Sequence, residues 1–164
     1  MNDFMIKPAT IDDVPLILQF IKDLAEYEKL LHEVVATEEI LRETLFGQHV
    51  HAEVVIGYLQ GQPVSFALFF HNFSTFLGRS GIYLEDLFVE PVARGKGIGQ
   101  KMLAYLAKLA KERNCGRLEW WVLDWNEEAI GFYKSLGAVP MDEWTVYRVT
   151  DQALDNLANK FDIM

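Results

Sequence analysis

In the stretch Val89–Lys108, VEPVARGKGIGQKMLAYLAK, a glycine-rich turn joins a strand-like run to an amphipathic helix. Glycines occupy every second position from Gly95 to Gly99, and Arg94 and Lys96 add positive charge. Such a turn presents backbone N–H groups at the positive end of a helix, where no β-carbon hinders the approach of a phosphate. The pattern therefore predicts an anion site, and the alternative is an ordinary flexible turn with solvated cations.

The spacing of the glycines narrows the choice of ligand. A dinucleotide-binding turn would need glycine at Lys96 or Gln100, and a P-loop would need a Gly-Lys-Ser/Thr sequence that does not follow. Neither nucleotide motif fits, so the expected ligand is another phosphate compound.

Composition limits the other possibilities. A chain of 164 residues, about half of them hydrophobic, predicts a single domain over residues 1–164. Its formal net charge of −9 argues against nucleic-acid binding and against a basic patch on anionic lipid, and it favours cationic ligands. Cys115 is the only cysteine, no signal peptide is visible and no apolar run could span a bilayer, so we expect a cytoplasmic protein.

Hydrophobic periodicity and turn residues predict eleven elements in the order β-α-α-β-β-β-α-β-α-β-α, an α/β chain of the α+β type whose mixed, mostly antiparallel sheet is flanked by helices. The expected strands cover residues 4–9, 52–59, 64–73, 81–89, 117–123 and 144–149. The expected helices cover residues 10–31, 38–46, 98–114 and 126–137 and a polar terminal segment from Asp151. Gly47 is expected to end the second helix in a left-handed turn.

The sequence Arg94–Gly99 matches the Gln/Arg-x-x-Gly-x-Gly/Ala signature and thus resembles the GCN5-related N-acetyltransferases (GNAT). The flanking stretches YLEDLFV (83–89) and WNEEAIGFYKSLGA (125–138) are similar to the diamine acetyltransferase branch, which includes polyamine and thialysine acetyltransferases. The resemblance covers nearly the whole chain and implies the GNAT fold, with acetyl-CoA as cosubstrate and a homodimer.

The resemblance also implies which residues hold acetyl-CoA. They include the backbone of Leu87, Phe88 and Val89, where a splay or bulge of the strand would free N–H groups, one of which could stabilise a developing oxyanion. The others are Arg94, Gly95, Lys96, Gly97, Ile98, Gly99, Gln100, Asn126 and Tyr133. Asn126 could cap the helix that follows it as well as bind the pantetheine.

Acetyl transfer requires a base for the amine and a proton for the thiolate. The resemblance assigns Glu85 as the base, acting through water, and Tyr133 as the acid. Strand alternation is expected to place Glu85 on the face opposite Leu84 and Asp86. The alternatives are a solvated carboxylate for Glu85 and a core aromatic ring for Tyr133. No acyl-enzyme intermediate is required, so direct attack in a ternary complex is expected.

Carboxylates dominate the candidate amine-binding residues. The resemblance implies a substrate site made by Tyr27, Glu28, Glu85, Asp86, Asp142 and Glu143. Acidic groups at two ends of a groove suit a small amine with two separated ammonium groups, although helical glutamates are more often solvated surface.

The histidines, the cysteine and the tryptophans give no further candidate site. The four histidines show no metal-ligand spacing with Cys115, which we expect to be structural, so no metal site is expected. The four tryptophans predict core or pocket packing rather than a base-stacking platform. A module that senses acyl-CoA without catalysis, and an enzyme acting on peptide amines, are the alternative functions.

Overall fold

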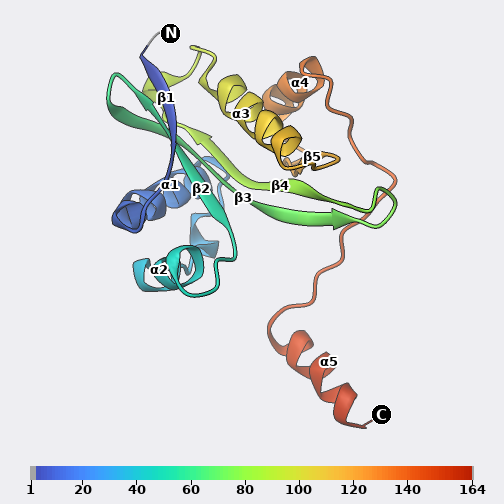
Figure 1. The fold of residues 1–164 in the computed structure, drawn as a ribbon. Coiled ribbons are helices and arrows are strands. Elements are labelled where there is room, and N and C mark those ends of the chain that lie inside the picture. The colour runs from blue at the N-terminus through green and yellow to red at the C-terminus, as the bar shows by residue number, and fades with distance from the viewer. Residues whose placement is uncertain (1–2, 164) are drawn as a thin grey trace. The chain divides into compact units, whose positions relative to one another are not determined.

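A computed structural model describes residues 3–163 and contains a five-stranded mixed sheet in the order β1-β2-β3-β4-β5 (Figure 1). The strands are β1 (Phe4–Pro8), β2 (Glu53–Leu59), β3 (Gln62–Ser74), β4 (Arg79–Val89) and β5 (Leu118–Trp120). The first four pair antiparallel, as expected of a meander, and β5 pairs parallel with β4. The predicted fold class is confirmed, with β5 shorter than the sequence indicated.

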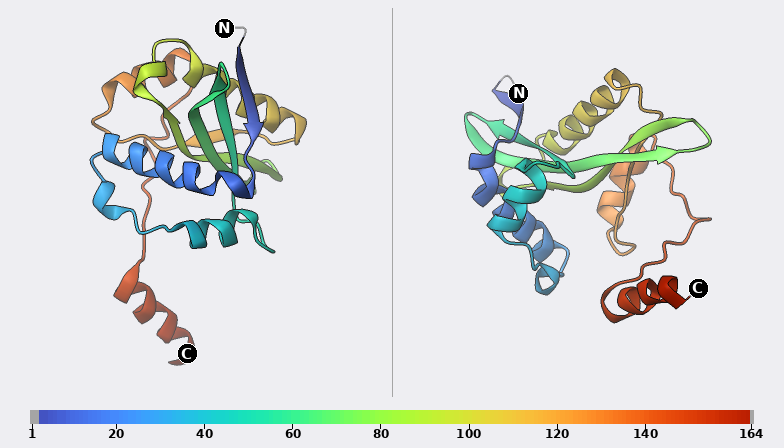
Figure 2. Two further views of the ribbon diagram at one scale, coloured as in Figure 1. Left: turned by 90° about the vertical axis from the view of Figure 1, so that its left-hand side faces the viewer. Right: turned by 60° about the horizontal axis from the view of Figure 1, so that its bottom comes forward.

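Helices cover both faces of this sheet. On one face lie α1 (Val14–Tyr27) and α2 (Glu38–Phe46), and on the other lies α3 (Ile98–Glu112) (Figures 1 and 2). Phe20 of α1 stacks on Phe66 of β3, with ring centroids 5.1 Å apart. Fully burying one such side chain contributes about 1.5–3 kcal/mol, so this face is a principal source of stability. α3 contributes its own buried stripe against β3 and β4.

Local signals explain where these helices begin and end. The Thr37 hydroxyl accepts a hydrogen bond from the Ile40 N–H at 3.2 Å and caps α2, which has the predicted bounds. Gly47 ends α2 with φ −83°, so the expected left-handed turn is wrong; a β-carbon there would clash with the Glu43 carbonyl. α1 stops at Tyr27 rather than near Leu31, because Lys29 adopts φ 63°.

The chain forms two compact units, one ending at Leu123 and one beginning at Asp124. The second contains α4 (Glu127–Ser135) and α5 (Asp151–Ile163). The strand predicted at residues 144–149 is wrong, because residues 138–150 contain no strand. Their β-favouring side chains are not enough, since a strand also needs a neighbouring strand to satisfy its backbone groups. Within residues 3–163, no helix meets the length and apolarity needed to cross a membrane.

Candidate functional site

The glycine turn leads directly into α3, and its backbone conformation requires glycine. Gly95 and Gly97 both have φ 78°, in the left-handed region, and Gly97 is the N-cap of α3. Among residues 3–163, and apart from the adjoining residues of the chain, no atom lies within 4 Å of the position that a β-carbon would take at either glycine. The turn is therefore open on the side where the first N–H groups of a 15-residue helix are exposed, which fits the approach of an anion.

Gly99 gives a second indication that the turn accommodates a ligand. Its φ is not in the left-handed region, and a β-carbon there would meet only Val89, at 4.0 Å, an ordinary contact. The protein's own packing thus does not require glycine at this position. Ile98, by contrast, is buried in the core and fixes the first turn of α3, while Lys96 and Gln100 are exposed.

Arg94 lies folded against the end of β4 and of α1. Its Nε donates a hydrogen bond to the Val89 carbonyl at 2.9 Å. Its guanidinium carbon lies 5.1 Å from the ring centroid of Tyr27 and 5.4 Å from that of Phe88. These are cation–π distances, so two aromatic rings help to hold the guanidinium group in place. No sequence signal indicated the contact with Tyr27.

The predicted splay of β4 is present. β5 pairs with β4 at three positions only, from Ile82 to Leu84, and the pairing ends there. Within residues 3–163, the edge of β4 that faces β5 has no strand neighbour over Leu87–Val89, although β3 pairs with the opposite edge. Apart from the Val89 carbonyl, which Arg94 engages, alternate backbone groups of these residues have no strand partner on this edge in the described part of the chain, as an extended pantetheine chain would require.

A β-bulge at Glu85 changes the predicted arrangement of the carboxylates. Leu84 pairs with Phe69, and Asp86 pairs with Leu68, so Glu85 is the extra residue. Because adjacent residues of β3 face opposite sides, Leu84 and Asp86 also lie on opposite faces. The expectation that they share a face is wrong, because strict alternation holds only where the register is regular.

The bulge brings Asp86 to the face covered by α1. Its pairing partner Leu68 packs against the cluster that contains Phe20 and Phe66. Burial, followed by the carboxylates of Glu85 and then Glu28, raises the pKa of Asp86 to about 7. Burial, followed by Glu85, also raises the pKa of Glu28, which caps the end of α1. The structure therefore brings Glu28, Glu85 and Asp86 into one acidic group, hereafter the carboxylate cluster.

The remaining candidates belong to the second unit. The Asn126 side-chain oxygen accepts a hydrogen bond from the Ala129 N–H at 3.2 Å, which confirms it as the N-cap of α4. Tyr133, half-buried on α4, has its ring centroid 5.7 Å from that of Phe132. Asp142 and Glu143 are exposed in a turn before Trp144. The roles of these four residues in binding or catalysis stay predictions.

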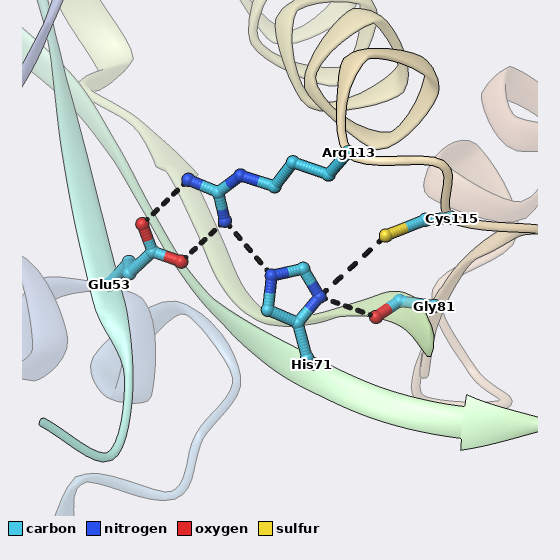
Figure 3. A network of polar contacts seen from close by, with 5 residues as sticks. All are labelled: Glu53, His71, Gly81, Arg113 and Cys115. Carbon is cyan, nitrogen blue, oxygen red and sulfur yellow. Dashed lines mark hydrogen bonds and ion pairs between the residues drawn. The ribbon is translucent and has the colours of Figure 1, made fainter. Parts of the chain in front are cut away.

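A polar network away from the turn involves residues far apart in the sequence (Figure 3). Arg113 donates two hydrogen bonds to the Glu53 carboxylate, at 2.7 and 2.9 Å, and its Nη1 lies 3.0 Å from His71 Nε2. His71 Nδ1 lies 3.0 Å from the Gly81 carbonyl, which can only accept, so Nδ1 is the protonated nitrogen.

This assignment limits what Cys115 can do. Its Sγ is 3.7 Å from His71 Nδ1, but a protonated Nδ1 cannot remove the thiol proton. The geometry therefore supports a structural cysteine. A cavity of about 170 Å³ bounded in part by Glu53, Tyr105 and Arg113 contains none of the candidate site residues. Among residues 3–163, no three His, Cys, Asp or Glu side chains are grouped to hold a metal ion.

Comparisons with known proteins agree with this architecture. The model of the acetyltransferase (GNAT) family matches residues 19–138. A thialysine N-epsilon-acetyltransferase from Bos taurus is 38% identical over 95% of this chain and 98% of its own length. An L-ornithine N5-acetyltransferase from Arabidopsis thaliana is 32% identical over 91% of this chain and 85% of its own.

A solved structure is similar as well. An integron cassette protein from V. cholerae superposes with a TM-score of 0.79 and 31% identity, covering 95% of this chain and 98% of the other. The family match spans the carboxylate cluster, the glycine turn and α4 together. The chain belongs to the acetyltransferase (GNAT) family.

Proposed function

We propose that this protein transfers the acetyl group of acetyl-CoA to a primary amine of a small molecule, by direct attack in a ternary complex. The observation that carries the proposal is the combination, within one unit, of an open glycine turn, a free edge of β4 and the carboxylate cluster. Polyamines, thialysine and lysine-like amines are the proposed acceptors, because each carries at least one ammonium group that carboxylates can bind.

Binding of acetyl-CoA would account for the open glycine turn and the free edge of β4. GNAT enzymes use acetyl-CoA, whose pyrophosphate fits the turn at Arg94–Gln100, where Gly95 and Gly97 leave room beside exposed N–H groups. Its extended pantetheine arm fits the unpaired edge at Leu87–Val89, and Asn126 is proposed to contact the same arm. Bound acetyl-CoA supplies an activated thioester carbonyl. An N–H on this edge would stabilise negative charge on that carbonyl oxygen.

The proton transfers are assigned to two residues. An alkylamine has a pKa of about 10 and is mostly protonated at neutral pH, so its proton must be removed before attack. Glu85 is exposed at the bulge, where water can connect it to the amine, and we assign it as the base. Tyr133 is assigned as the acid that protonates the departing thiolate.

The acceptor side is assigned to the carboxylate cluster. Glu28 and Asp86 are half-buried carboxylates whose raised pKa values show that their negative charge is poorly solvated. An ammonium group placed between them would offset that cost, which favours cationic ligands. Asp142 and Glu143 are proposed to contact a second ammonium group.

A homodimer and a cytoplasmic location are further parts of the proposal. The second unit exposes large apolar side chains that its two helices do not cover, including Tyr147 at 92% and Phe161 at 85% exposed. Large apolar side chains exposed in this way are candidates for an interface between subunits. Light scattering on the purified protein should therefore give twice the mass of the 18.8 kDa chain; a monomeric mass at micromolar concentration would remove the dimer.

The test of function is an amine panel with free CoA as the readout. Spermidine, thialysine, lysine and ornithine are each mixed with acetyl-CoA and enzyme, with a lysine-bearing peptide as the comparison. We expect thiol release with at least one small diamine and little with the peptide. Glu85→Gln, matched with Glu112→Gln on the exposed side of α3, should reduce turnover selectively. Tight acetyl-CoA binding without thiol release from any amine would favour the acyl-CoA sensor, and release with the peptide alone would favour a peptide substrate.

A further inference from the structure

Arg94 is held by contacts that leave its phosphate-binding groups uncommitted. Nε is engaged by the Val89 carbonyl, at 2.9 Å. Among the described residues, this is the hydrogen bond that the guanidinium group makes, and neither terminal nitrogen is within 4 Å of a carboxylate oxygen. The two terminal nitrogens are the pair that an arginine offers to a phosphate in a bidentate contact.

The rings of Tyr27 and Phe88 fix the orientation of this group. Their centroids lie 5.1 and 5.4 Å from the guanidinium carbon, so Arg94 makes two cation–π contacts. Phe88 is buried in the core and cannot move freely, whereas Tyr27 is the last residue of α1 and is 40% exposed. An arginine on the surface ordinarily loses considerable rotamer freedom when it binds an anion, and these contacts reduce that loss beforehand.

Glu90 is a nearby carboxylate that could have held Arg94 in an ion pair. Burial, and then Asp23, raise the pKa of Glu90, while Arg94 acts in the opposite direction. Arg94 is thus near enough to interact with Glu90, but the two form no ion pair in the described part of the chain. Aromatic rings therefore hold the guanidinium group, and its charge is not neutralised by a direct carboxylate contact.

We propose that Tyr27 is a positioning residue for the donor site, which acts through Arg94 and presets the guanidinium group for the pyrophosphate of acetyl-CoA. The inference rests on the proposed function and deepens it, because the resemblance assigned Tyr27 to the amine. It also connects the two substrate sites. Tyr27 adjoins Glu28 of the carboxylate cluster in the sequence, so the C-terminal end of α1 serves the donor and the acceptor together.

The test measures the dissociation constant of CoA, without any amine, by calorimetry. Tyr27→Leu should weaken CoA binding about two- to fivefold, the factor expected when an exposed cation–π contact is lost. Tyr27→Phe keeps the ring and should keep the wild-type constant. Tyr58→Leu is the matched control, since it removes a cation–π contact of the same kind, with Lys7 at 5.3 Å, outside the candidate site.

A double-mutant cycle separates positioning from a general structural effect. Because Tyr27 acts through Arg94, Tyr27→Leu should have no further effect on CoA binding in an Arg94→Gln background. An equal loss in both backgrounds, an unchanged constant for Tyr27→Leu in the wild-type background, or a loss with Tyr27→Phe would each overturn the inference. A wild-type protein that binds no CoA would instead overturn the proposed function itself, so the two failures are distinguishable.

Discussion

Replacing Asp86 by asparagine should remove a contribution to stability that the wild type loses as the pH rises. The pKa of Asp86 is raised from 3.8 to about 7, because burial and then the neighbouring carboxylates disfavour its charged form. Between these two values the folded chain keeps a proton that the unfolded chain has released. Stability from this group is therefore complete below about pH 4 and is lost as the pH rises to about 7.

The magnitude follows from the shift of about three pKa units. At 1.36 kcal/mol per unit, ionising Asp86 in the folded state costs about 4 kcal/mol by pH 8. Asparagine has nearly the same shape and no charge to desolvate. The difference in free energy of unfolding between Asp86→Asn and the wild type should therefore move by about 4 kcal/mol in favour of the variant between pH 4 and pH 8.

The assay is urea denaturation of both proteins at several pH values across that range. Subtracting the two curves cancels the groups that titrate equally in both proteins. Asp155→Asn, on the exposed surface of α5, is the control for removing one acidic charge without relieving burial. A difference that is constant with pH, or one that favours the wild type at pH 8, would refute the assignment of Asp86 as a desolvated carboxylate.

Three other changes test separate parts of the structure. Gly97→Val places a β-branched residue at φ 78°, so it should cost about 1–2 kcal/mol of stability. It should also weaken the affinity for acetyl-CoA more than the affinity for the amine, as measured by the two KM values. An equal loss of affinity for both ligands would indicate misfolding. Tyr133→Phe should lower kcat while acetyl-CoA affinity is kept, and an unchanged kcat would remove Tyr133 from the acid role. Arg113→Met breaks a partly exposed bridge to Glu53 and should cost about 0.5–1 kcal/mol at pH 7 by thermal unfolding. Because the Arg113 hydrogen bond lowers the pKa of Glu53, that cost should shrink below about pH 4.5, and a cost independent of pH would contradict it.

Local signals in the sequence were sufficient for much of the fold. α2 and the N-cap of α4 were predicted because Thr37 and Asn126 satisfy helix N–H groups within three residues of themselves. The strand at residues 144–149 failed for the opposite reason. Its residues favour extended backbone, but a strand forms only where a neighbouring strand is available to pair with it. Local β-propensity does not say whether such a neighbour exists.

The candidate site was predictable only in part. The glycine turn is visible because its residues are contiguous and glycine is required at φ 78°. The stacking of Tyr27 on Arg94, and the bridge between Glu53 and Arg113, join residues that are far apart in the chain. The hydrophobic periodicity of the sequence cannot predict these contacts, because they depend on how α1, α3 and the strands are packed.

Leu84 marks the position in β4 after which the proposed donor and acceptor sites can both form. Up to Leu84, β4 is a regular strand that pairs with β3 on one edge and β5 on the other. Immediately after it, pairing with β5 ends and the bulge at Glu85 reverses the faces of the strand. The first change leaves this edge of β4 without a strand neighbour among the described residues, and the second turns Asp86 toward the end of α1. Without the bulge, Asp86 would share a face with Leu84, on the side covered by α3, and the carboxylate cluster could not form. Under the proposed function, this single irregularity would let one strand present backbone groups to the thioester and carboxylates to the amine.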